Sequence, residues 1–307
     1  MVMSNERTVG VLGLGSMGMG VALTLVEHQF SVRGYDVRPE AMDALTEAGG
    51  AGGKTPGEVV AGCGTVIVLV VNAKQVEEVL FGENGAVAGM AKGTVVLQSS
   101  TVPAAFAKSC AERLAEYGMV MLDTPVSGGA GGARSGNLSV MASGSADGFD
   151  ASASVLEAIA GKVHRLGDEV GVGSTVKTVN QLLAGVHIAA AAEAMAFGVR
   201  AGADAQALYD VISGSAGSSW MFQNRVPHIL EDDYTPLSAV DIFVKDLGIV
   251  LETGHAMTFP LPLTSTAHQQ FLAASAAGFG REDDIAVFKV FQKLSGIAIE
   301  KNDAGDD

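Results

Sequence analysis

A lysine and two amide side chains stand at helical spacing in the middle of the chain. They are Lys177, Asn180 and Gln181, and positions i, i+3 and i+4 lie on one face of a helix. An apolar setting lowers the pKa of a lysine, which suits the amine to proton transfer at a substrate hydroxyl. A solvated lysine near a helix start gives the same pattern, and on this segment alone it is the commoner case. The segment therefore predicts either a general acid/base or a surface lysine.

A glycine-rich segment, residues 123–133, follows a short run of apolar residues. At its centre lie Ser127, Gly128 and Gly129. Successive glycines beside a serine expose several backbone N–H groups, and such a concavity suits an anion, here a substrate carboxylate. A flexible loop of the same composition is the alternative, and composition favours the two about equally.

A second glycine pattern lies close to the N-terminus. Gly13, Gly15 and Gly18 form G-x-G-x-x-G between a predicted strand and a predicted helix, and a further predicted strand ends in Asp36. In that context the pattern predicts a dinucleotide-binding turn, with the pyrophosphate at the N-terminus of the helix. Gly13 permits the tight turn, Gly15 lets the backbone approach the ligand, and Gly18 allows close helix packing. The alternative is a glycine-rich turn without a ligand.

Asp36 bears on which dinucleotide would bind. Its carboxylate can accept hydrogen bonds from the adenosine ribose and would repel a 2′-phosphate, which favours NAD over NADP. Arg38 lies two residues further on and works against this preference, unless it stacks on the adenine instead. The sequence therefore predicts NAD as the cofactor.

Lys245 belongs to a further charged group, Lys245-Asp246-Leu247, with Asp241 four residues before the lysine. Taken by itself, this spacing predicts an exposed ion pair between Asp241 and Lys245 on a helix, worth about 0.3–0.5 kcal/mol. The six histidines show no metal-ligand spacing and neither cysteine has a partner, so we expect no catalytic metal.

The elements that must position these residues change in kind along the chain. Apolar strand patterns alternate with helical patterns up to about residue 167, which predicts a parallel sheet covered on both faces. Beyond that point only helical patterns occur, beginning with one long alanine-rich stretch. We predict strands at residues 8–14, 31–36, 65–71, 94–98, 120–122, 137–143 and 162–166, and helices at 16–28, 39–47, 74–80, 103–117, 174–202, 205–213, 222–230, 240–253, 262–277 and 283–296.

This organisation predicts two domains. Residues 1–167 would form a doubly wound, mostly parallel α/β domain of the Rossmann type, and residues 168–307 a long connecting helix followed by an all-helical domain. The tail, residues 302–307, is polar and acidic and is expected to fray.

Composition excludes several classes of protein. The 307 residues include 19 Lys and Arg against 34 Asp and Glu, a net charge of −15, which disfavours nucleic acid and anionic membranes as partners. Residues 9–26 lack charge and are long enough to span a bilayer, but their glycines fit a strand, turn and helix better. Two cysteines, Cys63 and Cys110, fit a reducing compartment, so we expect a cytoplasmic protein.

Four segments, taken in order, resemble the 3-hydroxyisobutyrate dehydrogenase family of β-hydroxyacid dehydrogenases. They are the glycine fingerprint, residues 123–133, residues 171–180 and residues 245–247, and the resemblance covers about residues 9–291. It implies a Rossmann domain joined by a long helix to a helical domain, as in 6-phosphogluconate dehydrogenase. It also implies a homodimer or homotetramer that oxidises a short hydroxy acid.

The resemblance assigns roles to the residues already singled out. Lys177 would be the catalytic acid/base and Asn180 would orient the substrate, while Ser127, Gly128 and Gly129, with Gln181, would bind it. Thr101 and Lys245 would contact the cofactor. Many members have a Leu-Pro pair at the end of the third strand, where this chain has Val70 and Val71 just after Leu69. The full set expected to bind NAD is Gly13, Leu14, Gly15, Ser16, Met17, Gly18, Asp36, Val37, Arg38, Val70, Val71, Thr101 and Lys245.

The helical half is most similar to the L-threonate dehydrogenase branch of the family. The similarity lies in residues 218–225 and 239–247. A polyhydroxy acid calls for polar contacts, and four side chains could supply them: Ser219, Gln223, Asn224 and Arg225. L-Threonate is therefore the expected substrate, with 3-hydroxyisobutyrate and tartronate semialdehyde (2-hydroxy-3-oxopropionate) as alternatives. A non-catalytic NAD-binding scaffold is the alternative from another class, disfavoured because such relatives typically lose the lysine that is present here as Lys177.

Overall fold

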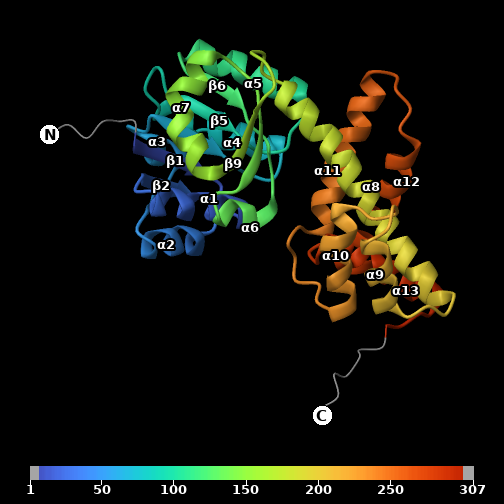
Figure 1. Cartoon of the computed structure of the whole chain (residues 1–307). Helices are drawn as coiled ribbons and strands as arrows, with labels where there is room; N and C mark the ends of the chain where they lie inside the picture. Colours follow the sequence, from blue (N-terminus) through green and yellow to red (C-terminus); the bar gives the residue numbers. More distant parts are fainter. Residues whose placement is uncertain (1–6, 300–307) are drawn as a thin grey trace. The chain divides into compact units, whose positions relative to one another are not determined.

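The computed structural model describes residues 7–299, and the chain divides into two units, residues 1–177 and 178–307. Unit 1 contains a sheet with helices on both faces, and unit 2 is helical (Figure 1). The division falls inside one long helix, α8 (Val172–Arg200). The domain boundary at residue 167 remains a prediction, because α8 contributes residues to both units.

Unit 1 is built on six parallel strands in the order β3-β2-β1-β4-β5-β6. This is the order of a doubly wound sheet, in which ligands bind beyond the carboxyl ends of the strands. The predicted fold class is confirmed. The strands are β1 (Thr8–Leu12), β2 (Ser31–Tyr35), β3 (Ala51–Gly52), β4 (Thr65–Val68), β5 (Val95–Gln98) and β6 (Val120–Asp123).

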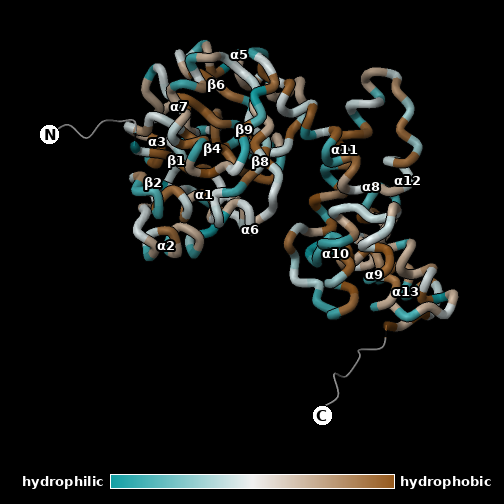
Figure 2. The backbone as a smooth tube through the Cα atoms, viewed as in Figure 1, coloured by the Kyte–Doolittle hydropathy of each residue, from teal (hydrophilic) through white to brown (hydrophobic). Residues whose placement is uncertain are grey.

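Alternate residues of the central strands enter two separate cores. Val9 and Val11 pack in the core on one face, while Leu12 packs in the core on the other. Because both faces are covered, the central strands are mostly apolar, and β4 is brown in Figure 2. The first core includes residues of α1 (Ser16–Glu27), α2 (Pro39–Glu47) and α7 (Ala146–Ile159). The second includes residues of α3 (Pro56–Val60), α4 (Ala73–Phe81) and α5 (Ala104–Glu116).

A second, three-stranded sheet contains the two strands predicted at residues 137–143 and 162–166. They are β8 (Leu138–Ala142) and β9 (Ala160–Arg165), and they pair with β7 (Val126–Ser127) in the order β7-β8-β9. The linker between β6 and β7 is too short for the crossover that a parallel strand needs, so β7 leaves the main sheet and pairs antiparallel with β8. One bridge, between Asp123 and Ser143, joins the ends of β6 and β8.

Three short or weakly patterned helices of unit 1 were not predicted. They are α3, α7 and α6 (Gly129–Arg134), and α6 occupies part of the segment expected to be a glycine-rich loop. In α7 the buried Phe149, Val155 and Ile159 share one face, but the small residues between them obscure the helical period. A further 3₁₀ turn covers Ala86–Ala88.

The helices of unit 2 lie close to their predicted positions, and no regular strand occurs among its described residues, 178–299. They are α8, α9 (Ala205–Ser213), α10 (Trp220–Glu231), α11 (Val240–Ala256), α12 (Pro262–Ala274) and α13 (Val287–Ser295), with a π-helical turn at Ser275–Phe279 and a 3₁₀ turn, η4, at Asp284–Ala286. Ile188, Met195, Phe243, Phe271 and Phe288 are fully or almost fully buried in one core. The predicted tail at residues 302–307 lies outside the described residues.

Helix α8 is long and apolar enough to cross a membrane, judged by length and composition alone. Half of its most apolar stretch is buried inside the protein, and Ile188, Ala192 and Met195 belong to the core of unit 2. A core helix of a globular domain passes the same test. The helix predicted at residues 174–202 is therefore present and contributes to the core of unit 2, with Val179 and Leu183 on its exposed side.

Candidate active site

The turn between β1 and α1 has the geometry expected of a dinucleotide-binding turn. Gly13 has φ +95°, and a Cβ on it would lie 2.5 Å from the carbonyl oxygen of Leu69, so only glycine fits. A Cβ on Gly18 would overlap the carbonyl oxygen of Gly13, because the helix packs directly on the turn. A Cβ on Gly15 would meet no atom within 4 Å. The protein's own packing therefore does not require glycine at this position, whereas close approach of a ligand does.

Helix α1 begins beside Gly15 without a capping side chain. The N–H groups of a first helical turn lack partners within the helix and carry the positive end of its dipole. Ser16, Met17 and Gly18 form this turn. The residues thus fit the pyrophosphate of a nicotinamide dinucleotide, which would lie against Gly15 and the first turn of α1.

Asp36 follows β2 and fastens the glycine turn. Its Oδ2 accepts from the backbone N–H of Leu14 at 2.8 Å, and its Oδ1 accepts from the backbone N–H and Nε of Arg38 at 3.0 and 2.9 Å. Arg38 also donates through Nη2 to the carbonyl oxygen of Leu14 at 3.0 Å. Burial alone would raise the pKa of Asp36, but the hydrogen bonds from Arg38 and Leu14 outweigh it and hold the pKa below its usual value. The carboxylate is therefore ionised at neutral pH.

Four more residues expected near the cofactor, Val37, Val70, Val71 and Thr101, lie beyond the carboxyl ends of β2, β4 and β5, the edge where such sheets bind ligands. Val37 and Val71 are exposed. The backbone N–H of Val70 donates to Ser100 Oγ at 2.9 Å, and Thr101 is half-buried. Their roles toward the cofactor remain proposals.

Helix α8 begins at the end of β6, and Asp123 joins the two. Asp123 Oδ2 accepts from the backbone N–H groups of Gly171 and Ser174 at 3.0 and 2.7 Å, and Oδ1 accepts from Ser174 Oγ at 2.7 Å. The carboxylate is fully buried. Burial raises the pKa of Asp123, while the hydrogen bonds from Ser174 and Gly171 oppose that rise. No separate role was predicted for Asp123.

The polar face predicted for α8 is a largely buried face of this helix. Lys177 and Gln181 are 6% and 8% exposed and Asn180 is half-buried, whereas Val176 and Val179 are exposed. The solvated-lysine alternative is therefore wrong. A buried ammonium or amine with two amides one turn away is an arrangement suited to proton transfer.

Asp246 connects the amides of α8 to Lys245. Gln181 Nε2 donates to Asp246 Oδ2 at 2.6 Å, and Asn180 Nδ2 donates to Gln181 Oε1 at 2.9 Å. Lys245 Nζ lies 2.6 Å from Asp246 Oδ1, in an ion pair that is largely buried rather than exposed. Asp241, the partner expected for Lys245, has its Oδ1 accepting from Ser275 Oγ.

Asp246 was not predicted as a site residue, although the sequence carries a signal for it. Phe243, Asp246 and Val250 follow one another at helical spacing, and all three are buried. A carboxylate on an apolar helix face needs a partner there. The partner itself, Gln181, lies 65 residues earlier and could not be inferred from the sequence.

The segment expected to hold a substrate carboxylate lies at the junction of β7 and α6. Ser127 pairs with Ser139 of β8, and Gly128 and Gly129 are exposed with φ of +128° and +64°. Glycine is favoured at both positions because side chains rarely adopt such φ values. A Cβ on Gly129 would meet nothing within 4 Å, so there is open space beside the turn.

The polar side chains of residues 218–225 are engaged within unit 2. Ser219 caps α10 by accepting from the N–H of Phe222 at 3.0 Å, and Gln223 Nε2 donates to Ser213 O and Ser218 Oγ at 3.0 Å each. The expectation that these groups are available to contact substrate is thus not supported for Ser219 and Gln223. Trp220, at the start of α10, is 64% exposed.

Arg225 is buried in an ion pair and is not available to a substrate. Its Nε and Nη2 donate to Asp284 Oδ1 and Oδ2 at 2.7 and 3.1 Å, Asp283 Oδ1 lies 3.7 Å from the same Nε, and Nη1 contacts Asn224. Burial raises the pKa of Asp284 to about 7 against the opposing effect of Arg225. Arg225 therefore attaches α10 to η4, and its suggested contact with substrate is wrong.

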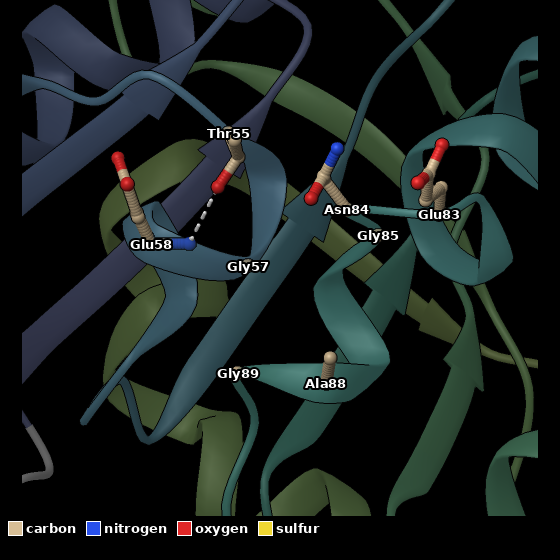
Figure 3. Close-up of a pocket in the computed structure, with 8 residues that line it drawn as sticks. All are labelled: Thr55, Gly57, Glu58, Glu83, Asn84, Gly85, Ala88 and Gly89. Carbon is tan, nitrogen blue, oxygen red and sulfur yellow. Dashed lines mark hydrogen bonds between the residues drawn. The ribbon is translucent and has the colours of Figure 1, made fainter.

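A surface hollow lies elsewhere on unit 1, between α3 and residues 83–89 (Figure 3). It contains none of the residues of the predicted site. Thr55 Oγ1 accepts from the N–H of Glu58 at 3.2 Å as the cap of α3, and Glu83 also lines the hollow. Two carboxylates without a lining cation do not suit an anionic substrate. Among residues 7–299 no group of three His, Cys, Asp or Glu side chains is arranged to hold a metal.

Comparison with known proteins agrees with this geometry. Residues 8–167 match the family model described as the NAD binding domain of 6-phosphogluconate dehydrogenase, and residues 171–291 match that described as NAD-binding of NADP-dependent 3-hydroxyisobutyrate dehydrogenase. L-Threonate dehydrogenase of Cupriavidus necator is 59% identical over 93% of this chain and 96% of its own length. L-Threonate dehydrogenase of Escherichia coli K12 is 53% identical over 95% and 97%.

A solved structure extends the comparison to the whole fold. The crystal structure of 3-hydroxyisobutyrate dehydrogenase from Salmonella typhimurium superposes with a TM-score of 0.87 at 49% identity, over 92% of this chain and 99% of that one. Both sequence and fold thus agree from the glycine turn to the helical unit. The chain belongs to the 3-hydroxyisobutyrate dehydrogenase family of NAD(P)-dependent hydroxyacid dehydrogenases.

Proposed function

We propose that this protein oxidises L-threonate with NAD and that Lys177 is the general base. The buried Lys177, one turn before Asn180 and Gln181 on α8, carries the proposal for the reaction class. The proposal for L-threonate rests on relatives of that name at 49–59% identity over nearly the full length of the chain.

The proposed reaction divides between a proton and a hydride. The nicotinamide cofactor accepts the hydride when it is bound. The neutral amine of Lys177 takes the proton of the substrate hydroxyl, and the same carbon loses its hydride, so the C–O single bond becomes a carbonyl and Lys177 becomes an ammonium. Gly128 and Gly129, with Ser127, would hold the substrate carboxylate through backbone N–H groups, and Asn180 would orient the reacting hydroxyl.

Lys245, Gln181 and Asp246 would support this geometry in unit 2. The carboxylate of Asp246 fixes both the ammonium of Lys245 and the amide of Gln181, whose oxygen in turn holds Asn180. A proton acceptor works only when its substrate is held within hydrogen-bond reach. We infer that this chain of contacts keeps Asn180 and Lys245 oriented for substrate and cofactor.

The proposal of NAD over NADP rests on Asp36. Its ionised carboxylate stands where a dinucleotide fingerprint places the adenosine ribose, and it would repel a 2′-phosphate. One matched family model carries NADP in its description, so family membership alone does not choose between the two cofactors.

Other hydroxy acids are second candidates. The Salmonella structure is described as a 3-hydroxyisobutyrate dehydrogenase, which favours that substrate as the first alternative, and tartronate semialdehyde remains another. A non-catalytic scaffold of the same fold is disfavoured by the retention of Lys177 in a buried position.

A substrate panel tests the proposal. Reduced-nicotinamide absorbance is followed with NAD or NADP and L-threonate, D-threonate, both erythronates, 3-hydroxyisobutyrate and glycerate. Turnover of L-threonate with NAD is expected. Turnover of 3-hydroxyisobutyrate or glycerate alone would retain the reaction class and discard the substrate, and NAD binding without turnover of any acid would favour the scaffold.

Lys177→Ala should lower kcat by about 10²–10⁴-fold, the range expected for loss of a general acid/base. NADH titration of the same variant should show an unchanged Kd, because the fingerprint lies at residues 13–18. Thr175→Ala, at an exposed position of the same helical turn, is the matched control. A Lys177→Ala enzyme with near-normal kcat would remove Lys177 from the mechanism.

We also propose a homo-oligomer located in the cytoplasm. Large apolar side chains of unit 2 are exposed, among them Trp220, Met257, Phe259 and Leu263, and a contact between copies would cover such groups. Cys63 and Cys110 are free and buried, as in proteins of reducing compartments. Light scattering after gel filtration distinguishes dimer, tetramer and monomer.

A further inference from the structure

We propose that Asp123 is a positioning residue for Lys177: its buried carboxylate fixes the first turn of α8 to the strand that leads into the substrate-carboxylate segment. The inference rests on the proposed function for the role of Lys177. It adds a residue that touches neither substrate nor cofactor and acts through the helix start.

Asp123 holds the helix start with both carboxylate oxygens. Oδ2 accepts from two backbone N–H groups, those of Gly171 and Ser174, and Oδ1 accepts from the hydroxyl of Ser174. The first N–H groups of a helix have no partners within it, and a carboxylate there also interacts favourably with the helix dipole. Because Asp123 comes from β6, this is a cap supplied by a strand 48 to 51 residues earlier.

The strand end that carries Asp123 is itself fixed on two sides. The backbone N–H of Thr124 donates to Gln98 O of β5 at 2.9 Å, and Asp123 exchanges backbone hydrogen bonds of 2.9 Å with Ser143. The N–H of Met141 donates to Pro125 O at 2.9 Å. The carboxylate therefore extends from a rigid base, and the same base continues directly into Ser127.

The first turn of α8 lies against this base without room for a side chain. A Cβ on Gly173 would lie 2.7 Å from Asp123 O and would overlap Met141 O. The N–H of Gly173 donates to Ser143 Oγ at 3.0 Å. Contacts of this kind leave the helix start little freedom to shift or rotate.

Lys177 lies one turn beyond this attachment. It is the third residue after Ser174, which corresponds to a rise of about 4.5 Å along a helix. The position and rotation of the first turn therefore determine where the Lys177 amine is presented. A displacement of about 1 Å between reacting groups can lower a rate by about 10²-fold.

The test compares Asp123→Ala with Asp123→Asn. Alanine removes the three hydrogen bonds that Asp123 accepts from Gly171 and Ser174. Asparagine retains them, since its amide oxygen can accept from Gly171 and Ser174 while its NH₂ donates to the Ser174 hydroxyl. We expect Asp123→Ala to lower kcat by about 10²-fold and Asp123→Asn to restore it to within about threefold of wild type. The Kd of NADH should not change in either variant.

Two matched variants separate positioning from general loss of stability. Ser174→Ala removes one of the three bonds and should lower kcat less than Asp123→Ala. Ser152→Ala removes a buried hydroxyl bond of 2.7 Å within α7 of the same unit and should leave kcat unchanged. A melting temperature that falls equally in Ser152→Ala and Asp123→Ala, with kcat lowered only in the latter, supports positioning.

Hydrogen exchange supplies a readout that needs no substrate. Peptides covering residues 171–177 should exchange faster in Asp123→Ala than in wild type and Asp123→Asn. If wild type turns over no hydroxy acid, the proposed function fails, while the exchange still decides whether Asp123 holds the helix. Unchanged exchange, or a kcat of Asp123→Ala within about threefold of wild type, overturns the inference.

Discussion

Asp36 and Arg38 are the residues on which the proposed preference for NAD depends. The guanidinium of Arg38 lies against the carboxylate of Asp36 and reaches the carbonyl oxygen of Leu14. Asp36 in turn accepts from the N–H of Leu14 within the glycine turn. Arg38, which sequence analysis allowed either to oppose the preference or to stack on adenine, is thus held by the acid beside it.

Removal of the carboxylate should therefore change cofactor preference. In Asp36→Ala the guanidinium of Arg38 loses its carboxylate partner and can meet a 2′-phosphate, and the ribose loses its acceptor. We expect the ratio of kcat/KM for NAD to that for NADP to fall by about 10–100-fold. The variant loses one charge-assisted hydrogen bond to the ribose of NAD and no longer repels the 2′-phosphate of NADP. The double variant Asp36→Ala/Arg38→Ala should lose NAD activity without gaining NADP activity. An unchanged ratio in Asp36→Ala would show that Asp36 does not contact the ribose.

At the scale of elements, the start of α8 is a closely packed junction of the candidate site. Gly171, Gly173 and Ser174 meet β6 and β8 through hydrogen bonds and direct backbone contact. Helix propensity alone would favour alanine over glycine at an interior position by about 1 kcal/mol. Packing should reverse that preference at Gly173.

Gly173→Ala should destabilise the protein by about 1–3 kcal/mol, because its Cβ would meet backbone oxygens that cannot move aside. Gly248→Ala, in the interior of α11 where a Cβ would meet nothing within 4 Å, should instead stabilise it by up to about 1 kcal/mol. Urea unfolding of the two variants measures the contrast. Equal effects at the two positions would contradict the close junction.

Helices and strands were predicted correctly where the residue pattern of the segment itself was sufficient to define them. The bounds of α2 and α9 agree with their predicted ranges, since each is a short amphipathic segment with a defined start. β8 and β9 were recognised as strands but not assigned to a separate sheet, because strand pairing is a long-range property.

For the candidate site, too, the sequence predicted local features but not contacts between distant residues. The types and spacing of Lys177 and Asn180 identified a helix face, but only the fold shows that Lys177 is buried. Partners far along the chain were inaccessible to sequence analysis: Asp246 for Gln181, Asp123 for Ser174, and Asp284 for Arg225. The last of these pairs explains why Arg225 was wrongly considered for the substrate.

At the scale of the whole molecule, the chain has 34 Asp and Glu and a net charge of −15, so many carboxyl groups contribute to the dependence of its stability on pH. Groups such as Asp36, whose pKa is lowered in the folded state, stabilise the protein as pH rises. The pKa of Asp284 is shifted in the opposite direction. Burial raises its pKa to about 7, so between about pH 4 and 7 the folded state holds a proton that the unfolded state has lost.

Stability contributed by Asp284 should therefore be present below about pH 4 and lost as pH rises toward 7. Asp284→Asn removes this titration, so the free energy of unfolding of the variant should rise relative to that of wild type over the same interval. Denaturant unfolding of both proteins at a series of pH values measures the difference. If the attraction of Arg225 outweighs burial, the relative stability of the variant falls instead.

The division of the chain inside α8 has a consequence for the construction of chimaeras. Lys177 belongs with Asp123 and Ser174 in the first unit, whereas Asn180 and Gln181 belong with Asp246 in the second. A graft that exchanges everything after residue 177 for the corresponding part of a relative would transfer Asn180, Gln181, Lys245 and Asp246 together. It would leave Lys177, the proposed proton acceptor, and its attachment untouched. Because α8 is continuous, the graft would keep the rotation of Asn180 and Gln181 about the helix axis relative to Lys177. The contribution of the second unit to substrate preference could then be exchanged while Lys177 stays in place.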